Sequence, residues 1–253
     1  MDLNLRGKVA LVTGGGSGLG AGISEVLAEE GAHVIVNYIV DEENVLKFVD
    51  ELNQKYKTTC MAMYGDISKA EDIDRSIAKA IEFYGQIDIL VNNAGIWPTA
   101  KILDMTDAEW RKVMDINLTG TFLLSKRIAQ HMVERKISGR IINISSKSGF
   151  SYSTGGHAHY ASAKAGVIML TKALAREISQ YGINVTGVAP GMVRTPMNTK
   201  QLANGGEEEY LKRIPVGRIS EPREVAYTVA FLASDKADFI TGTTVDVTGG
   251  MLI

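Results

Sequence analysis

Two side chains in the middle of the chain have the types and the spacing needed to move a proton. Tyr160 and Lys164 lie four residues apart in the stretch YASAKAG, which is rich in small residues. Positions i and i+4 share one face of a helix, so the ammonium group can lie beside the phenol. A free tyrosine titrates near pH 10, and a neighbouring cation favours the phenolate. The pair predicts a general acid/base, although by itself it also fits a surface tyrosine beside a solvated lysine.

A glycine-rich segment near the N-terminus has the composition of a dinucleotide-binding turn. Residues 14–20 read GGGSGLG, between an apolar run at 8–13 and a helical pattern at 21–30. Glycines there let the backbone approach a pyrophosphate, which then lies on the helix N-terminus. The strict glycine pattern fits only in its alanine form, through Gly16, Gly18 and Ala21. We expect cofactor contacts within this turn from Gly14, Ser17, Gly18, Leu19 and Gly20.

The residues that follow the second expected strand, 32–38, bear on which dinucleotide fits. An acid there holds the ribose hydroxyls of NAD, whereas an arginine accommodates the phosphate of NADP. Residues 37–39 carry no charge, residues 41–43 are all acidic, and no cation lies between His33 and Lys47. A 2′-phosphate would face three carboxylates. We therefore expect NAD rather than NADP, with Asn37 able to hydrogen-bond either ribose.

Short apolar runs alternate with helical patterns along the whole chain. Strands are expected at 8–13, 32–38, 59–64, 87–91, 140–145, 183–189 and 244–247, and helices at 21–30, 42–55, 68–84, 106–135, 159–181 and 221–233. Ser68 with Glu71 and Thr106 with Glu109 form capping-box patterns at two helix starts. The alternation predicts an α/β fold with βαβ units and right-handed crossovers. We expect one Rossmann-type domain over residues 1–253, a doubly wound parallel sheet with helices on both faces. Residues 191–215 are interpreted as a loop with one short helix that forms a substrate lid.

Six short motifs occur in one order along the chain. They are T-G-x-x-x-G-x-G from Thr13, Asn92-Asn93-Ala94-Gly95, Asn117, Ser145-Ser146, Tyr160-x-x-x-Lys164 and Pro190-Gly191. In this order and spacing the chain resembles the short-chain dehydrogenase/reductase family, from Leu5 to Ile253. The resemblance implies an NAD(P)-dependent oxidoreductase that interconverts a secondary alcohol and a ketone by hydride transfer.

The resemblance also implies a role for each matching residue. Tyr160 is the general acid/base, and Lys164 lowers its pKa and holds the nicotinamide ribose. Ser146 binds the substrate oxygen, and Ser145 is the alternative candidate for that role. Asn117 anchors a water of a proton relay; the alternative is that its side chain forms a hydrogen bond to the backbone of an adjacent strand. Further cofactor contacts are implied at Asp66, Ile67, Asn92, Ala94, Gly95, Pro190, Gly191, Val193 and Thr195.

The substrate side of the expected pocket departs from the family. The interval from Ser146 to Tyr160 is 14 positions, one longer than the usual family spacing, so the loop between them is longer. Trp97, Tyr152 and His157 offer an aromatic and hydrogen-bonding wall, which favours a small polar substrate such as a sugar or polyol.

Two alternatives to a sugar or polyol dehydrogenase remain. The first is a 3-oxoacyl-[acyl-carrier-protein] reductase using NADPH, which the chain resembles in overall pattern. Such reductases dock an acidic carrier protein with basic residues, and one of these positions is Tyr181 here. The second is a non-enzymatic dinucleotide sensor, which would be expected to lose Tyr160 or Lys164.

Composition limits the cellular setting and the partners. The 253 residues carry a formal net charge of −2 and one cysteine. Near-neutral charge argues against nucleic acid or an anionic membrane as the main partner. A lone cysteine suits a reducing compartment, so we expect a cytoplasmic protein. We expect no membrane span, because apolar runs are short, and no metal, because ligand spacings are missing. The family implies a homo-oligomer, usually a tetramer.

Overall fold

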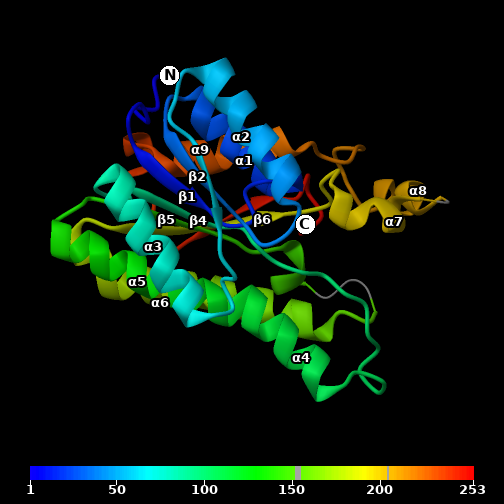
Figure 1. Cartoon of the computed structure of the whole chain (residues 1–253). Helices are drawn as coiled ribbons and strands as arrows, with labels where there is room; N and C mark the ends of the chain where they lie inside the picture. The colour runs from blue at the N-terminus through cyan, green and yellow to red at the C-terminus, as the bar shows by residue number, and fades with distance from the viewer. Residues whose placement is uncertain (152–154, 204) are drawn as a thin grey trace.

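A parallel β-sheet forms the centre of the computed structural model, which describes residues 1–151, 155–203 and 205–253 (Figure 1). Seven strands lie in the order β3-β2-β1-β4-β5-β6-β7, and every pairing is parallel. The strands are β1 (Val9–Val12), β2 (His33–Tyr38), β3 (Met61–Tyr64), β4 (Ile89–Asn92), β5 (Arg140–Ile144), β6 (Asn184–Pro190) and β7 (Thr244–Val247). The order reverses between β1 and β4, and such a switch point places a ligand crevice at the carboxyl ends of the strands. The predicted doubly wound α/β fold is confirmed.

Helices cover both faces of the sheet (Figure 1). One layer holds α1 (Gly18–Glu29), α2 (Glu42–Tyr56) and α9 (Pro222–Ala233), and the other holds α3 (Ala70–Tyr84), α5 (Gly120–Arg135) and α6 (Ala158–Ile178). The helix α4 (Asp107–Met114) precedes α5, while α7 (Thr199–Leu202) and α8 (Gly206–Leu211) lie beyond the carboxyl ends of the strands. No described helix is long and apolar enough to cross a membrane.

Each central strand contributes to two apolar cores. In β1, Ala10 and Val12 join the core under α1, α2 and α9, whereas Val9 and Leu11 join the core under α3, α5 and α6. Successive side chains of a strand point to opposite faces, so a strand covered on both sides must be apolar throughout. This explains why the buried strands read as continuous apolar runs.

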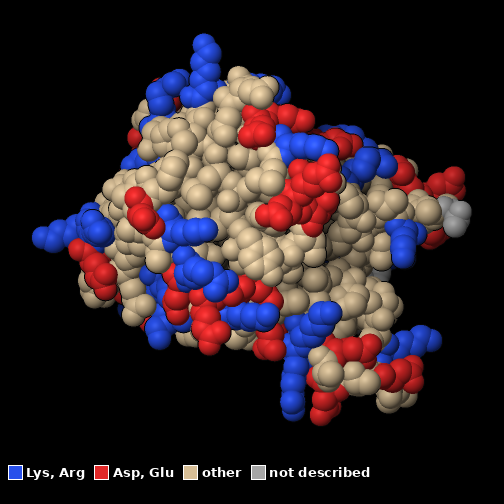
Figure 2. Space-filling model, viewed as in Figure 1, with Lys and Arg blue, Asp and Glu red and all other residues tan. Residues whose placement is uncertain are grey.

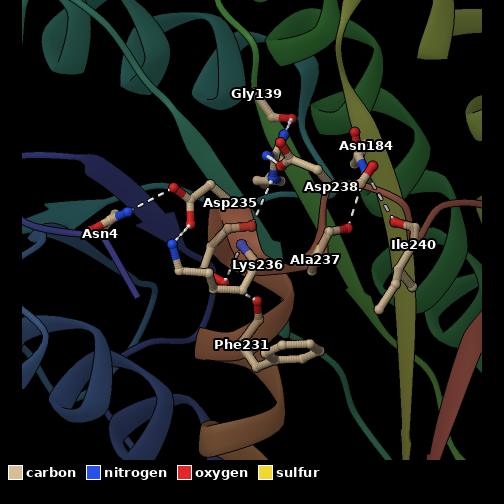
Figure 3. Close-up of polar contacts among 11 residues, drawn as sticks. Asn4, Gly139, Asn184, Phe231, Asp235, Lys236, Ala237, Asp238 and Ile240 are labelled. Atoms are coloured by element: carbon tan, nitrogen blue, oxygen red, sulfur yellow. Dashed lines mark hydrogen bonds and ion pairs between the residues drawn. The ribbon is translucent and has the colours of Figure 1, made fainter. Parts of the chain in front are cut away.

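A polar cluster fixes the amino-terminal edge of the sheet, away from the strand ends that carry the ligand crevice. The buried guanidinium of Arg140 donates to the carbonyl oxygens of Gly139 and Ser234 and to the carboxylate of Asp238. The amide of Asn184 donates to the carbonyl oxygens of Asp238 at 2.8 Å and Ile240 at 3.1 Å (Figure 3). These bonds anchor the turn between α9 and β7 to two strands.

The capping box predicted at Ser68 and Glu71 is wrong. The helix α3 begins after Lys69 and has no side-chain cap. The Ser68 hydroxyl instead donates to Oδ1 of Asp66 at 2.7 Å, because that nearby carboxylate is the stronger acceptor. The capping box at Thr106 and Glu109 is confirmed.

Several elements differ from expectation in their bounds or in their kind. The helix α1 begins at Gly18 rather than at residue 21, so part of the glycine turn is already helical. The long helix expected over 106–135 contains a π-helical turn, Asp115–Thr119, between α4 and α5. Residues 191–215 hold two short helices, α7 and α8, rather than one. Sequence periodicity does not reveal such local changes of helical pitch.

Candidate active site

A cavity of about 390 Å³ lies at the carboxyl ends of the strands. Its lining includes the described residues predicted for cofactor, catalysis and substrate, apart from Asn92 and His157. Tyr152, the remaining predicted residue, lies outside the described residues. The lining also contains residues that were not predicted individually as contacts, among them Asn93, Lys147, Met192, Met197 and Tyr210.

The glycine turn forms a cradle that side chains would fill. Gly14 and Gly18 have φ of 59° and 51°, which favour glycine. A Cβ atom on Gly20 would lie 2.0 Å from the carbonyl oxygen of Gly14, and one on Gly18 would lie 3.3 Å from Cβ of Thr195. Ser17 is the N-cap of α1, and its side chain makes no hydrogen bond to the helix. The first backbone N–H groups of α1 have no partner within the helix and are therefore available to a ligand at this end. The cradle fits a dinucleotide pyrophosphate.

Asn93, rather than Asn92, holds the glycine turn in place. Its side-chain nitrogen donates to the carbonyl oxygen of Thr13 at 2.9 Å, and its backbone N–H donates to Oγ1 of Thr13 at 2.9 Å. Asn92 is the last residue of β4, and its amide nitrogen donates inside the core to Ser125 at 2.9 Å and to Asn143 at 2.8 Å. The strand pleat therefore turns Asn92 away from the cavity that was predicted to contain it.

The phenol of Tyr160 lies beside the Ser146 side chain in the cavity lining. Burial raises the pKa of Tyr160, while a hydrogen bond with the Ser146 side chain opposes that rise. Burial is the larger of the two effects, so the net shift of the Tyr160 pKa is upward. Ser145, the alternative serine, is buried and donates its hydroxyl hydrogen to the carbonyl oxygen of Val188 at 3.1 Å. Of the two serines, Ser146 is the one placed beside the phenol.

Lys164 is buried beneath Tyr160, one helical turn further along α6. Its ammonium nitrogen donates to the carbonyl oxygen of Ile144 at 2.9 Å and lies 5.7 Å from the centroid of the Tyr160 ring. Burial lowers the pKa of Lys164 to about 8. The lysine is therefore mainly charged at neutral pH and loses its proton in mildly alkaline solution.

Asn117 occupies the π-helical turn and is fully buried. Its amide nitrogen donates to the carbonyl oxygens of Ile96 at 3.1 Å and Val113 at 3.0 Å. A Cβ atom on Gly95 would lie 2.5 Å from Oδ1 of Asn117 and 3.6 Å from Nζ of Lys164. A glycine at this position lets the amide and the ammonium group approach each other. π-helical turns are frequent at functional sites.

The adenosine end of the cavity is lined by Tyr38, Ile39 and Val40. Asn37 also lines it, but its amide nitrogen already donates to the carbonyl oxygens of Met63 at 3.3 Å and Gly65 at 2.9 Å, which tie β2 to β3. Acidic side chains gather over the start of α2 (Figure 2).

Those acids differ in how they are paired. The Tyr38 hydroxyl donates to Oε1 of Glu42 at 2.6 Å, which raises the pKa of Tyr38 to about 12. Glu43 accepts from Lys47 at 2.6 Å, and Asp41 accepts from the Asn44 amide at 2.7 Å. One lysine thus opposes three carboxylates, and this end of the cavity keeps a negative balance.

Aromatic rings form the wall beside Tyr160. Trp97 lines the cavity and stacks on His157, with 4.7 Å between the ring centroids, and lies 6.3 Å from the Tyr160 ring. His157 lies behind Trp97 and bonds through Nδ1 to the carbonyl oxygen of Pro98 at 2.9 Å. Burial lowers the pKa of His157, so the ring is neutral and supports the indole rather than lining the cavity.

The rest of the wall comes from the segment 191–215. Met192, Ile214 and Ile219 form a small buried cluster, against which Trp97 and Tyr210 pack. Arg194 bonds Glu207 of α8, within the same segment, at 2.8 Å. Its guanidinium also lies 3.4 Å from Glu221, the N-cap of α9, and this contact ties the segment to the body of the protein. The substrate side of the cavity is therefore largely apolar.

A dinucleotide cradle beside a half-buried tyrosine and serine and a buried lysine defines a nicotinamide-dependent oxidoreductase. The comparisons with known proteins agree. A family model described as "Enoyl-(Acyl carrier protein) reductase" matches residues 14–252. The 3-oxoacyl-[acyl-carrier-protein] reductase of Vibrio cholerae is 42% identical over 249 residues, 98% of this chain and 99% of that protein. The reductase of the same name from Thermotoga maritima is 37% identical over 253 residues, 99% of this chain and 100% of that protein.

Solved structures give the same result. A putative gluconate dehydrogenase from Agrobacterium tumefaciens superposes with a TM-score of 0.94 at 34% identity, over 100% of this chain and 98% of that one. A short-chain type dehydrogenase/reductase from Mycobacterium marinum gives 0.94 at 31% identity, over 99% and 97%. The chain belongs to the short-chain dehydrogenase/reductase family, whose members use NAD(P) and act on CH–OH groups. Among the substrates considered, the curated relatives favour a 3-oxoacyl thioester over a sugar or polyol.

Proposed function

We propose that this protein reduces the ketone of a 3-oxoacyl thioester to a secondary alcohol. The observation that carries the proposal is the apolar wall of Trp97, Met192 and Tyr210 beside the phenol of Tyr160. An acyl chain gains free energy when it is buried against such a wall. A polyhydroxylated sugar would instead leave hydroxyl groups without partners there. The names of the curated relatives support the same substrate class.

The proposed roles follow from the geometry of the side chains. Ser146 and Tyr160 converge on the substrate oxygen and stabilise the negative charge that develops there. Tyr160 donates its phenolic proton to that oxygen. Lys164, charged at neutral pH, stabilises the resulting phenolate. When bound, the nicotinamide cofactor supplies the hydride. Asn117 fixes the backbone around Gly95 beside the lysine and anchors a water of the proton relay.

The cofactor contacts are part of the proposal. The glycine cradle would hold the pyrophosphate on the N-terminus of α1, and Asp66 with Ile67 would contact the adenine. Gly95, Val193 and Thr195 would meet the ribose and the carboxamide. We propose a preference for NAD(H), because Asp41 and Glu42 at the start of α2 would repel a 2′-phosphate. Measured dissociation constants test this preference: tenfold tighter binding of NADPH than of NADH would overturn it.

We also propose that residues 191–215 close over the substrate and that identical chains associate in a cytoplasmic homotetramer. Met192, Thr195 and Tyr210 line the cavity from this segment, which supports its role as a lid. Phe122 on α5 and Met169 on α6 are exposed apolar side chains on the helical layer, 42% and 61% accessible. Light scattering coupled to gel filtration measures the mass in solution, and a monomer would contradict the assembly.

A substrate panel tests the proposed reaction. The 3-oxobutanoyl thioester of N-acetylcysteamine, a ketose, a polyol and a sugar acid would be assayed in both directions with both cofactors. We expect kcat/KM for the thioester to exceed that for every sugar and polyol by at least tenfold. A higher kcat/KM for a polyol or a sugar acid would replace the proposed substrate class.

A further inference from the structure

His159 is a buried histidine that directly precedes the proposed proton donor. It is fully buried and is not among the described residues that line the cavity. Nδ1 of its imidazole accepts a hydrogen bond from the backbone N–H of Tyr160 at 2.9 Å. A ring nitrogen that accepts carries no proton, so the neutral ring has its proton on Nε2. No step of hydride or proton transfer derived above uses this imidazole.

The bond supplies the cap that the start of α6 otherwise lacks. The N-cap of this helix, His157, makes no side-chain hydrogen bond to the helix. The first helical bond joins the backbone N–H of Ala161 to the carbonyl oxygen of His157 at 2.9 Å. The N–H of Tyr160 precedes that bond and has no acceptor in the helix ladder. In many helices the N-cap side chain accepts from this position, and here the imidazole of His159 does so.

A fixed N–H in the first turn of α6 fixes where the phenol lies. The phenol forms a hydrogen bond with the Ser146 side chain, which follows the end of β5. Lys164, one turn further along α6, is held separately, because its ammonium nitrogen donates to the carbonyl oxygen of Ile144 at 2.9 Å. If the first turn loosens, Tyr160 therefore moves relative to Ser146 while Lys164 keeps its place. A displacement of about 1 Å can lower a reaction rate by about a hundredfold.

The other nitrogen of the ring indicates that the bond serves geometry more than stability. Nε2 of His159 is buried and has no hydrogen-bond partner among residues 1–151, 155–203 and 205–253. A buried donor without a partner lowers the stability of the fold, and this cost offsets what the Nδ1 bond contributes. Burial lowers the pKa of His159, while the carbonyl group of His157 and the charge of Glu109 oppose that shift. The net shift is downward, so the ring is neutral at neutral pH and Nδ1 can accept.

We propose that His159 is a positioning residue, whose Nδ1 holds the backbone N–H of Tyr160 and thereby keeps the phenol beside Ser146. The inference rests on the proposed role of Tyr160 as the proton donor, but not on the identity of the ketone. It predicts that kcat depends on an acceptor at the place of Nδ1. Binding of the substrate and of the dinucleotide does not depend on it, because His159 does not line the described cavity.

Three substitutions separate the acceptor from the rest of the ring. In H159N the amide oxygen is two bonds from Cβ, as Nδ1 is, and it can accept from the same N–H. In H159Q the amide oxygen is three bonds from Cβ, as Nε2 is, and H159F has no acceptor. We expect H159N to keep kcat within threefold of the wild type, and H159Q and H159F to lose at least tenfold. KM and the dinucleotide dissociation constant should stay within threefold in all three.

His131 on α5 provides the matched control. It is also buried, and its Nε2 accepts from the backbone N–H of Ile87, before β4, at 3.3 Å. H131F removes the same kind of bond away from the cavity, so we expect its kcat to stay within threefold of the wild type. Equal losses of kcat in H131F and H159F, or in H159N and H159Q, would overturn the inference. If H159F does not fold, H159N and H159Q still decide.

A spectroscopic measurement needs no turnover. Long-range proton–nitrogen NMR spectra of the full chain report which nitrogen of each histidine ring carries the proton, and the His159 signals are those missing from H159N. We expect the proton on Nε2. A proton on Nδ1 would overturn the inference, because a protonated Nδ1 cannot accept from the Tyr160 N–H.

The kinetic test is independent of the proposed substrate class. It uses whichever substrate of the panel the wild type turns over, so a failure of the thioester proposal leaves it intact. Retained turnover in Tyr160→Phe would refute the proposed role of Tyr160 and with it the positioning role of His159. Impaired turnover in Tyr160→Phe together with wild-type turnover in H159Q and H159F would refute the positioning role alone.

Discussion

Asn117 and Ile96 bond each other through two hydrogen bonds. The amide nitrogen of Asn117 donates to the carbonyl oxygen of Ile96 at 3.1 Å, and the backbone N–H of Ile96 donates to Oδ1 of Asn117 at 3.3 Å. The bonds join the π-helical turn to the segment that follows β4. Since Gly95 and Trp97 flank Ile96, one buried amide fixes both the cofactor side and the substrate side of the cavity.

The substitution Asn117→Ala is expected to destabilise the fold and to lower activity. It leaves the N–H and the carbonyl group of Ile96 without their partner, and an unsatisfied buried polar group costs about 1–3 kcal/mol. We expect the free energy of unfolding in urea to fall by about 2–3 kcal/mol and kcat to fall more than tenfold. Asn44→Ala, an exposed site, is the control. An unchanged unfolding midpoint would show that the two bonds contribute nothing.

The substitution Tyr160→Phe is expected to remove the proton donor without removing the cofactor site. General acid catalysis contributes about 10²–10⁴-fold, so we expect kcat to fall by that factor. The phenyl ring keeps its packing, and dinucleotide affinity, measured by fluorescence titration, should stay within threefold. Tyr181→Phe, at a half-exposed site, is the control. Turnover above a tenth of the wild-type value would assign the proton to another group.

The ionisation of Lys164 is expected to be visible in stability as well as in rate. Its folded-state pKa of about 8 is below the ordinary value of 10.5, so the unfolded chain binds more protons between these limits. The contribution of Lys164 to the free energy of unfolding therefore rises as the pH increases from about 8 to about 10.5. Ketone reduction falls over the same range, because the neutral amine no longer stabilises the phenolate.

Urea unfolding at pH 7.5, 8.5 and 9.5 measures this contribution. Lys164→Met should lack the rise that the wild type shows, while Lys79→Met, which removes an exposed lysine of α3, should retain it. The measurements stop below pH 10. Above pH 10 the unfolded chain loses the Tyr38 proton first, because the pKa of Tyr38 is raised to about 12 in the folded protein, and the free energy of unfolding then falls with pH. Identical pH slopes for the wild type and Lys164→Met would contradict the buried, depressed lysine.

The substitution Gly20→Ala is expected to abolish dinucleotide binding. Its Cβ atom would lie 2.0 Å from the carbonyl oxygen of Gly14 and 2.6 Å from the Asn93 amide, so the turn must open. Gly155→Ala is the matched control, since its Cβ atom would meet nothing within 4 Å. We expect calorimetry to show dinucleotide affinity at least a hundredfold weaker in Gly20→Ala alone. Affinity close to that of the wild type would mean that the cradle tolerates side chains.

Local patterns in the sequence determined the fold class and the central pair of reactive side chains. The alternation of apolar strands and helices predicts the doubly wound sheet, because each strand is buried on both faces. The four-residue spacing of Tyr160 and Lys164 needs only one helix to bring the groups together. The glycine turn likewise depends on its own backbone, which explains why these predictions required no knowledge of distant contacts.

Only the tertiary structure decided which of two adjacent residues serves the site. Ser145 donates to the carbonyl oxygen of Val188, whereas Ser146 bonds the Tyr160 phenol. Likewise, the Asn92 amide donates inside the core, whereas Asn93 bonds Thr13 of the glycine turn. Long-range contacts also decided the remaining details. They commit the Asn37 amide to the carbonyl oxygens of Met63 and Gly65, and they raise the pKa of Tyr160 through burial. Such contacts join residues far apart in the chain, and their geometry follows from packing rather than from spacing.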